Sequence, residues 1–284
     1  MLKSYYYLTK PGIIYGNAIN TAAGFFLASQ GAYDFKLLMI TIVGISLIVA
    51  SACVFNNILD ANIDAKMERT KNRAMVRGTV KKSYAITFGI VLLIFGITNL
   101  ALSTNHLALY AALIGFFVYV FLYTFSKRYS VYGTEIGSVA GAMPPVVGYL
   151  SVSYEIDSGA IILFAIFVLW QMPHFYAIAI YRLKEYVAAD IPILSAVKGV
   201  RRTKMNILAY ILAFTVAVLL LKLLNYTGYV YLFVMSVLCL AWLVMAFRGF
   251  KAADDSKWAR GMFKFSLLIV LTFCVIIPID KFLT

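Results

Sequence analysis

Two carboxylates and one amide are spaced so that they could hold a metal ion together. Asn56, Asp60 and Asp64 stand four residues apart, at the end of a long apolar run. If a helix continues through Asp64, each interval of four turns the side chain by only about 40°, and all three lie on one stripe. Such oxygens suit Mg²⁺, which takes one or two carboxylates together with phosphate oxygens of a substrate. The pattern therefore predicts a Mg²⁺ site.

Basic side chains follow directly after this acidic stripe. Arg69, Arg73 and Arg77 are again four residues apart, and the same segment contains Lys66 and Lys71. Guanidinium groups bind phosphates in a bidentate manner. Acids beside several cations at a membrane edge indicate a metal–diphosphate site, with these five residues as substrate ligands. The alternative is a solvated helix end whose charges form local salt bridges and set membrane orientation.

A second polar group lies at the end of another apolar run. His174 is one of two histidines, and Glu185 follows it in a basic segment. An ionisable side chain within a span indicates a functional site, although a hydrogen-bonded packing histidine is the alternative. Lys127 and Arg128 end a further run, where they either set orientation or contact an anionic part of a substrate. Glu135 needs a partner, which we expect to be one of these two cations.

The composition indicates where these groups must sit. Of the 284 residues, 63% are hydrophobic and only 13% charged, and the mean hydropathy is +0.88. A soluble domain carries about a quarter charged residues, so this chain must bury its apolar surface in a lipid bilayer. The net charge of +13 is then explained by basic loops and not by nucleic-acid binding. The cysteines all lie in apolar runs, where we expect reduced thiols.

Nine apolar runs approach the roughly 20 residues that a transmembrane helix needs. We predict an all-α membrane protein, a bundle of nine transmembrane helices forming a single domain over residues 1–284. The first run is expected to be retained, not cleaved as a signal peptide. The fifth contains Pro144-Pro145, which predicts a kinked helix inside the bundle. The predicted spans are 12–30, 37–57, 84–103, 107–125, 134–152, 159–181, 206–224, 228–247 and 263–280.

The basic residues predict the orientation. Of 25 Lys and Arg residues, 22 lie at the N-terminus or after the second, fourth, sixth and eighth runs. Basic loops stay in the cytoplasm, so we expect a cytoplasmic N-terminus and an external C-terminus. Two long loops on that side, about 58–83 and 182–205, follow the two polar groups. Long loops of this kind are usually functional or disordered, and we expect these two to carry the chemistry.

Several segments resemble a known family. The N-xxx-D-xxx-D pattern and the stretch Glu68–Arg73 resemble the UbiA-type intramembrane prenyltransferases, and the resemblance extends along nearly the whole chain. The first pattern is typical of the superfamily, whereas two later segments indicate the branch that farnesylates heme. The supporting segments are Thr9–Gly12, Val54–Asn57, Ser130–Thr134, Gly141–Pro145 and Trp170–Phe175, of which the last two indicate the heme branch.

The resemblance implies the UbiA-type fold and transfer of farnesyl from farnesyl diphosphate to the 2-vinyl group of heme B, giving heme O. It makes the acidic stripe a catalytic Mg²⁺ site and places His174 on the heme side, as iron ligand, orienting group or proton carrier. Tyr132, within a matching segment, becomes a substrate-binding residue. The resemblance also implies the cell inner membrane, and a heme A synthase or a terminal oxidase as partner.

One position departs from the family pattern. Superfamily members usually have a second pair of acids four residues apart in the second loop. Here Glu185 is followed at that spacing by Ala189, and Asp190 comes one position later. We carry Glu185 over as a metal and substrate ligand, and a second metal is either held differently or absent.

Three other functions remain open. A family member could instead prenylate a quinone precursor or a chlorin. A secondary transporter would also show broken helices, but its charges should gather near the membrane midplane and not at one surface. A passive assembly subunit would leave the acidic stripe unexplained.

Overall fold

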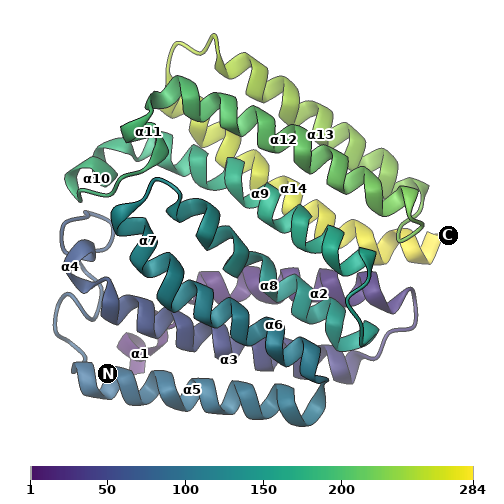
Figure 1. Cartoon of the computed structure of the whole chain (residues 1–284), viewed down its shortest axis with the longest axis horizontal. Coiled ribbons are helices and arrows are strands. Elements are labelled where there is room, and N and C mark those ends of the chain that lie inside the picture. The colour runs from purple at the N-terminus through teal and green to yellow at the C-terminus, as the bar shows by residue number, and fades with distance from the viewer. Residues whose placement is uncertain (1, 284) are drawn as a thin grey trace.

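The computed structural model describes residues 2–283, and within that range it contains helices and connecting turns without strands (Figure 1). Its elements are α1 (Leu2–Leu8), α2 (Pro11–Ser29), α3 (Phe35–Leu59), α4 (Ala61–Asp64), α5 (Lys82–Ser103), α6 (His106–Phe117), the π-helical segment η1 (Val118–Tyr123), α7 (Thr124–Tyr129), α8 (Gly133–Ser153), α9 (Ser158–Tyr181), α10 (Leu183–Ala188), α11 (Leu194–Val197), α12 (Gly199–Leu223), α13 (Tyr229–Gly249) and α14 (Asp255–Leu283).

Eight helical stretches in the described residues are long and apolar enough to cross a membrane, so the chain is a multi-pass membrane protein. They are α3, α5, the continuous stretch His106–Tyr129, α8, α9, α12, α13 and α14. The predicted first span corresponds to α2, a 19-residue helix that packs against α3, α8 and α14. Asn17 and Asn20 within it lower its mean hydropathy. Each of the nine predicted runs thus corresponds to a helix of the bundle.

Two helices begin well before the predicted boundaries. α12 starts at Gly199 and not near 206, and α14 starts at Asp255 and not near 263. Hydropathy locates only the apolar part of a helix, whereas Lys and Arg are good helix formers and extend it into the polar region. The second long loop is therefore shorter than predicted, and it contains α10 and α11.

Close backbone packing holds α8 in the middle of the bundle, as predicted. α8 continues through Pro144 and Pro145, which are both buried. A Cβ added at Gly148 would lie 2.0 Å from the carbonyl oxygen of Thr21, and one at Gly24 would lie 1.9 Å from that of Pro145. Small residues let transmembrane helices approach this closely. The α2–α8 contact therefore depends on glycine at both positions.

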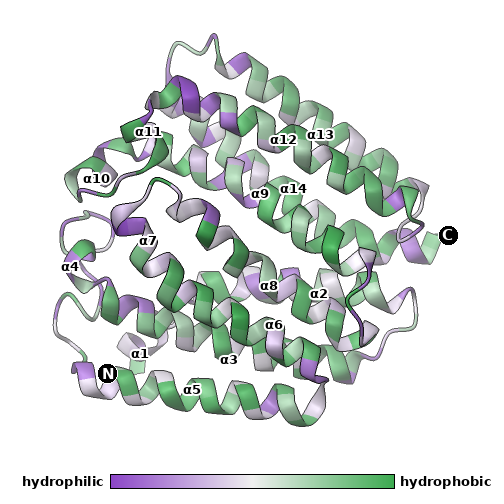
Figure 2. Cartoon of the chain, in the orientation of Figure 1, coloured by the Kyte–Doolittle hydropathy of each residue, from purple (hydrophilic) through white to green (hydrophobic). Residues whose placement is uncertain are grey.

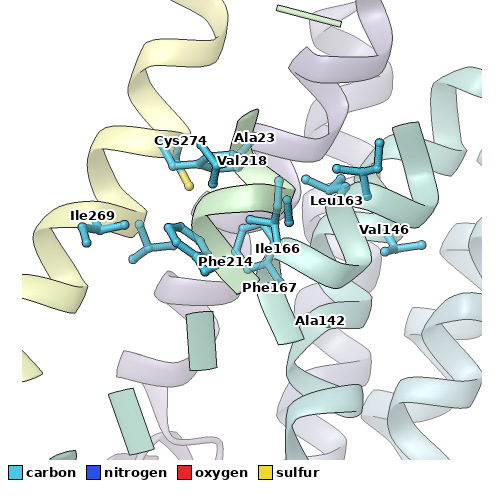
Figure 3. Packing of buried hydrophobic residues seen from close by; sticks show 14 of the residues in the cluster. Ala23, Ala142, Val146, Leu163, Ile166, Phe167, Phe214, Val218, Ile269 and Cys274 are labelled. Carbon is cyan, nitrogen blue, oxygen red and sulfur yellow. The ribbon is translucent and has the colours of Figure 1, made fainter. Parts of the chain in front are cut away.

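The apolar core joins helices that are distant in the sequence. Figure 3 shows Phe167 of α9 beside Phe214 of α12, with Ile269 of α14 nearby. The rings of Phe167 and Phe273 meet edge to face with centroids 5.8 Å apart. Apolar residues also cover the outer faces of the long helices (Figure 2), and Phe95 of α5 is 63% exposed. This outer surface is suited to lipid contact.

The two ends of the bundle differ in content. Figure 1 places α4, α10, α11 and the end of α7 at one end, and the α12–α13 connection and the C-terminus at the other. The end that carries α4 also carries the basic segments. Both polar groups identified in the sequence therefore lie toward the same end, as predicted.

Candidate active site

The acidic stripe of Asn56, Asp60 and Asp64 is present, although the helix that carries it is interrupted. α3 ends at Leu59, and Asp60 has φ −89° and ψ 0°, so the predicted continuous helix is interrupted there. Backbone bonds still connect each turn, with Asp60 N–H donating to the Asn56 carbonyl (2.9 Å) and Asp64 N–H to the Asp60 carbonyl (2.8 Å). All three residues of the stripe are buried, at 2–5% exposure.

Asp60 is held by two cations from the end of α7. Its Oδ2 accepts a hydrogen bond from Lys127 Nζ, and its Oδ1 lies 3.5 Å from Arg128 Nη2. The same Nη2 donates to the Leu59 carbonyl at 2.6 Å. These contacts join α3 to α7 and place both cations beside the acidic stripe.

Asp64 is held by the loop that follows it. Arg73 Nη1 donates to Asp64 Oδ2 at 2.6 Å. The buried Thr70 hydroxyl donates to the Asp64 carbonyl at 2.9 Å, which folds the loop back over the stripe. Of the three arginines predicted to bind phosphate, Arg73 is therefore the one that reaches an acid.

Asn56 brings in a residue that the sequence did not single out. Lys10, the residue before α2, donates from Nζ to Asn56 Oδ1 at 2.6 Å, and Asn56 Nδ2 donates to Thr124 Oγ1 at 3.0 Å. Burial of the Lys10 ammonium lowers its pKa to about 8, and the positive charges of Arg73 and Lys127 add to this effect. The sequence did contain a signal for Lys10. It stands directly before the proline that starts α2, in a segment that resembles the family.

A tyrosine wall faces the acidic stripe from the π-helical segment η1. Tyr119 and Tyr123 stack with centroids 5.4 Å apart, and Lys127 Nζ lies 5.0 Å from the Tyr123 ring. A Cβ at Gly137 of α8 would lie only 2.7 Å from that ring, so glycine makes room for it. π-Helical turns often mark functional sites. Neither tyrosine was predicted, because aromatic residues in an apolar run look like packing residues.

The remaining basic residues of the first loop lie further out. Lys66 forms an exposed salt bridge of 2.9 Å with Asp190, which joins the two predicted loops. Lys71 pairs with Glu68 at 2.6 Å, also on the surface. Arg69 and Arg77 are exposed. Residues 65–80 form turns and no helix, so Arg69, Arg73 and Arg77 do not share one helical face.

The second loop carries the carboxylate of Glu185, which pairs with Arg182. Glu185 Oε1 accepts from Arg182 Nη1 at 2.9 Å, while its Oε2 is buried without a hydrogen-bond partner among the described residues. Burial raises the pKa of the neighbouring Tyr186 to about 12, an effect that the nearby charge of Arg69 opposes. The exposed Tyr132 lies at the same end, with Lys198 Nζ 5.5 Å from its ring.

Glu135 has a different partner from the one predicted. Its Oε1 accepts from the Tyr176 hydroxyl at 2.6 Å, whereas Lys127 and Arg128 are committed to Asp60. Its Oε2 is buried without a hydrogen-bond partner in the described part of the chain. The charge count near the membrane surface could not show that a tyrosine of α9 lies closer to Glu135 than either cation.

A hydrogen bond to Ser266 orients the His174 ring. Its Nδ1 lies 2.8 Å from Ser266 Oγ, and that hydroxyl lies 2.6 Å from the Phe263 carbonyl oxygen, to which it donates. With the hydroxyl proton given to that carbonyl, the oxygen accepts from Nδ1–H and Nε2 keeps its lone pair. The ring lies between Trp170 and Phe263, with centroids 5.1 and 4.8 Å away. A neutral imidazole with a free Nε2 is the form that ligates metals.

The oxygen donors of the acidic stripe fit Mg²⁺ together with a diphosphate. The stripe offers only oxygen ligands, and Lys10, Arg73, Lys127 and Arg128 bring more positive charge than its two carboxylates can balance. That excess suits an anionic substrate. No group of three or more His, Cys, Asp or Glu side chains gathers anywhere in the described residues. Glu185 therefore does not complete a three-acid cluster, and its metal role stays a prediction.

Comparison with known proteins adds an independent observation. The profile of the UbiA prenyltransferase family matches residues 17–268. The chain belongs to this family. Among the relatives of this chain, one from Edwardsiella ictaluri, named protoheme IX farnesyltransferase, is 52% identical over 99% of this chain and 95% of its own length. Proteins of the same name from Serratia proteamaculans and Escherichia coli are each 51% identical over the same shares.

Solved structures of other proteins share the fold of this chain. A digeranylgeranylglyceryl phosphate synthase has a TM-score of 0.84 at 19% identity, covering 100% of this chain and 99% of its own. A UbiA homolog from Archaeoglobus fulgidus, bound to DMAPP and Mg²⁺, has a TM-score of 0.71 at 14% identity, covering 97% and 99%. At these identities the likeness establishes the UbiA-type fold that the sequence predicted.

Proposed function

We propose that the chain transfers the farnesyl group of farnesyl diphosphate to the 2-vinyl group of heme B, giving heme O and diphosphate. The observation that carries this proposal is the 52% identity, over nearly the full length, to a protein named protoheme IX farnesyltransferase. The cation-rich acidic stripe supports it, because a prenyl diphosphate is an anion with an apolar tail, and this end of the bundle offers both charges and apolar helices.

The acidic stripe would hold the diphosphate end of the donor. Asp60, Asp64 and the Asn56 amide oxygen would hold Mg²⁺, which when bound neutralises the leaving diphosphate as negative charge develops on it. Lys127 and Arg73, which pair with these carboxylates, would move to the diphosphate oxygens. The UbiA homolog from Archaeoglobus fulgidus likewise binds DMAPP, a prenyl diphosphate, together with Mg²⁺.

The bond changes follow from the chemistry of an allylic diphosphate. The C1–O bond breaks, diphosphate keeps the electron pair, and the allylic cation adds to the terminal carbon of the vinyl group. Water captures the cation that forms beside the porphyrin ring and loses a proton, which leaves a hydroxyethylfarnesyl side chain. The faces of Tyr119 and Tyr123 would stabilise the allylic cation by cation–π interaction.

His174 would act on the acceptor. The hydrogen bond to Ser266 leaves Nε2 with its lone pair, which favours iron ligation over proton donation among the roles open to this residue. We also propose substrate contacts from residues of α7, α10 and the loops that follow α4 and α7, which are Lys66, Arg69, Lys71, Arg77, Arg128, Tyr132 and Glu185.

The basic end of the bundle would face the cytoplasm, in the cell inner membrane, with the N-terminus inside and the C-terminus outside. Diphosphate would then enter and leave on the cytoplasmic side. Heme O would pass to a heme A synthase or a terminal oxidase.

The test is turnover by the purified protein with farnesyl diphosphate, Mg²⁺ and heme B, with the product identified by its mass. Parallel reactions offer a quinone precursor or a chlorin as acceptor, because a digeranylgeranylglyceryl phosphate synthase shares the fold and the fold does not select the acceptor. Farnesylated heme supports the proposal. Product from another acceptor alone, or substrate uptake into vesicles without turnover, would reject it.

A further inference from the structure

A column of aromatic side chains runs along the contact between α9 and α14. From the basic end inward it passes from Tyr181 to Phe263 (centroids 5.9 Å apart), from Phe263 to His174 (4.8 Å) and from His174 to Trp170 (5.1 Å). α9 and α14 pack directly against each other. His174 and Tyr181 are seven residues apart on α9, about two turns and roughly 10 Å along the helix axis, on the same face.

Two guanidinium groups stand at the outer end of this column. Arg182 lies 5.3 Å and Arg260 5.7 Å from the centroid of the same Tyr181 ring. Arg182 also pairs with Glu185, whereas Arg260 forms no salt bridge within the described residues. Two like charges beside one ring repel each other, and a single carboxylate balances only one of them. The arrangement favours an anionic ligand that contacts both guanidinium groups.

We propose that Arg182 and Arg260 bind the two propionate carboxylates of the acceptor porphyrin, with the iron toward His174. This inference rests on the proposed function, because it takes heme as the acceptor. A porphyrin is a flat aromatic ring with both carboxylates on one edge and the metal at its centre. The column offers matching groups in the same order: guanidinium pair, aromatic rings, and a neutral imidazole with a free Nε2.

The two cations at the end of α7 are the other candidates for binding the propionates. Lys127 and Arg128 are both bonded to Asp60, and their charges are needed where diphosphate forms. Propionates bound there would compete with the leaving group for the same cations. The pair beside Tyr181 separates the two anionic parts of the substrates, so donor and acceptor can bind together.

The test compares Arg260→Gln with Lys257→Gln, which removes the same charge from an exposed position on the same helix. Each protein is assayed with heme B and with heme B dimethyl ester, whose propionates are esterified. Losing a charge-assisted hydrogen bond should raise the KM for heme B about tenfold in Arg260→Gln. We expect no change in the KM for farnesyl diphosphate, and no change in either KM for Lys257→Gln.

The ester identifies the ligand group. Esterification should raise the KM of the wild-type protein and of Lys257→Gln, and it should have a smaller effect on Arg260→Gln, in which only Arg182 still pairs with a propionate. An unchanged KM for heme B in Arg260→Gln, or an ester penalty as large as in the wild type, would overturn the proposal. An effect that appears only when anionic lipid is present would also overturn it, in favour of a lipid headgroup at this pair.

Direct binding separates this inference from the proposed function. Heme B is titrated into each purified protein and followed by its absorption, which needs no turnover. A wild-type protein that neither binds nor farnesylates heme B would reject both. Tight binding that is indifferent to Arg260 and to esterification would reject only the propionate contact.

Discussion

Replacing Asp60 with asparagine tests the acidic stripe most directly. Asparagine keeps the shape and one acceptor oxygen but removes the negative charge that Lys127 and Arg128 share. Breaking a buried ion pair costs about 3–5 kcal/mol. The side chains of Lys127 and Arg128 are 16% and 28% exposed, so solvent screens part of that charge. We therefore expect a loss of about 2 kcal/mol in stability.

The expected loss of activity is larger and has another cause. A group that neutralises charge in the transition state contributes about 3–4 kcal/mol. Each 1.36 kcal/mol is a factor of ten in rate, so kcat for farnesyl transfer should fall by about 10²–10³-fold. The concentration of Mg²⁺ that gives half-maximal rate should rise as well. The assay is heme O formation from farnesyl diphosphate and heme B, over a range of Mg²⁺ concentrations.

A charge-balanced variant separates the two effects. Asp60→Asn combined with Lys127→Met removes one charge of each sign, so it should recover most of the lost stability but none of the activity. Asp254→Asn is the control, because Asp254 is an exposed acid just before α14 whose side chain accepts the Lys257 N–H, as an asparagine would. Wild-type kcat and Mg²⁺ dependence in Asp60→Asn would refute the assignment of the stripe as the metal site.

Three further outcomes follow from other parts of the structure. Ser266→Ala removes the hydrogen bond that orients His174, so heme affinity should fall by a few fold. His174→Ala should abolish the shift in heme absorption on binding. Equal heme spectra in the wild type and both variants would contradict iron ligation. Gly148→Ala should lower the free energy of unfolding by about 1–3 kcal/mol, because its Cβ would meet the Thr21 carbonyl. The control Gly16→Ala places its Cβ in open space and should be neutral or stabilising. A phosphatase fused to the C-terminus should be active outside the cytoplasm, and activity only for a cytoplasmic reporter would reverse the proposed orientation.

Much of the fold could be predicted because spanning a membrane leaves few solutions. The apolar runs gave the helices of the bundle, and N-xxx-D-xxx-D gave three buried side chains on one stripe. Helix ends were less predictable, since hydropathy does not detect the polar first turns of α12 and α14. Long-range partners were the least predictable part. Lys10 reaches Asn56 across 46 positions and Tyr176 reaches Glu135 across 41, and no local pattern encodes either contact.

Aspartates at the two ends of the bundle have different kinds of partner, and this difference indicates which end does chemistry. Asp157 accepts from the Ala160 N–H and from the hydroxyls of Tyr149 and Tyr226, so it fixes the start of α9. One of these donors is the backbone of the first turn of α9, and the other two are tyrosine hydroxyls. Asp60 and Asp64 are held by lysine and arginine side chains from other segments. Such flexible cations could move from a carboxylate to a diphosphate while the backbone stays in place, as the proposed prenyl transfer would need.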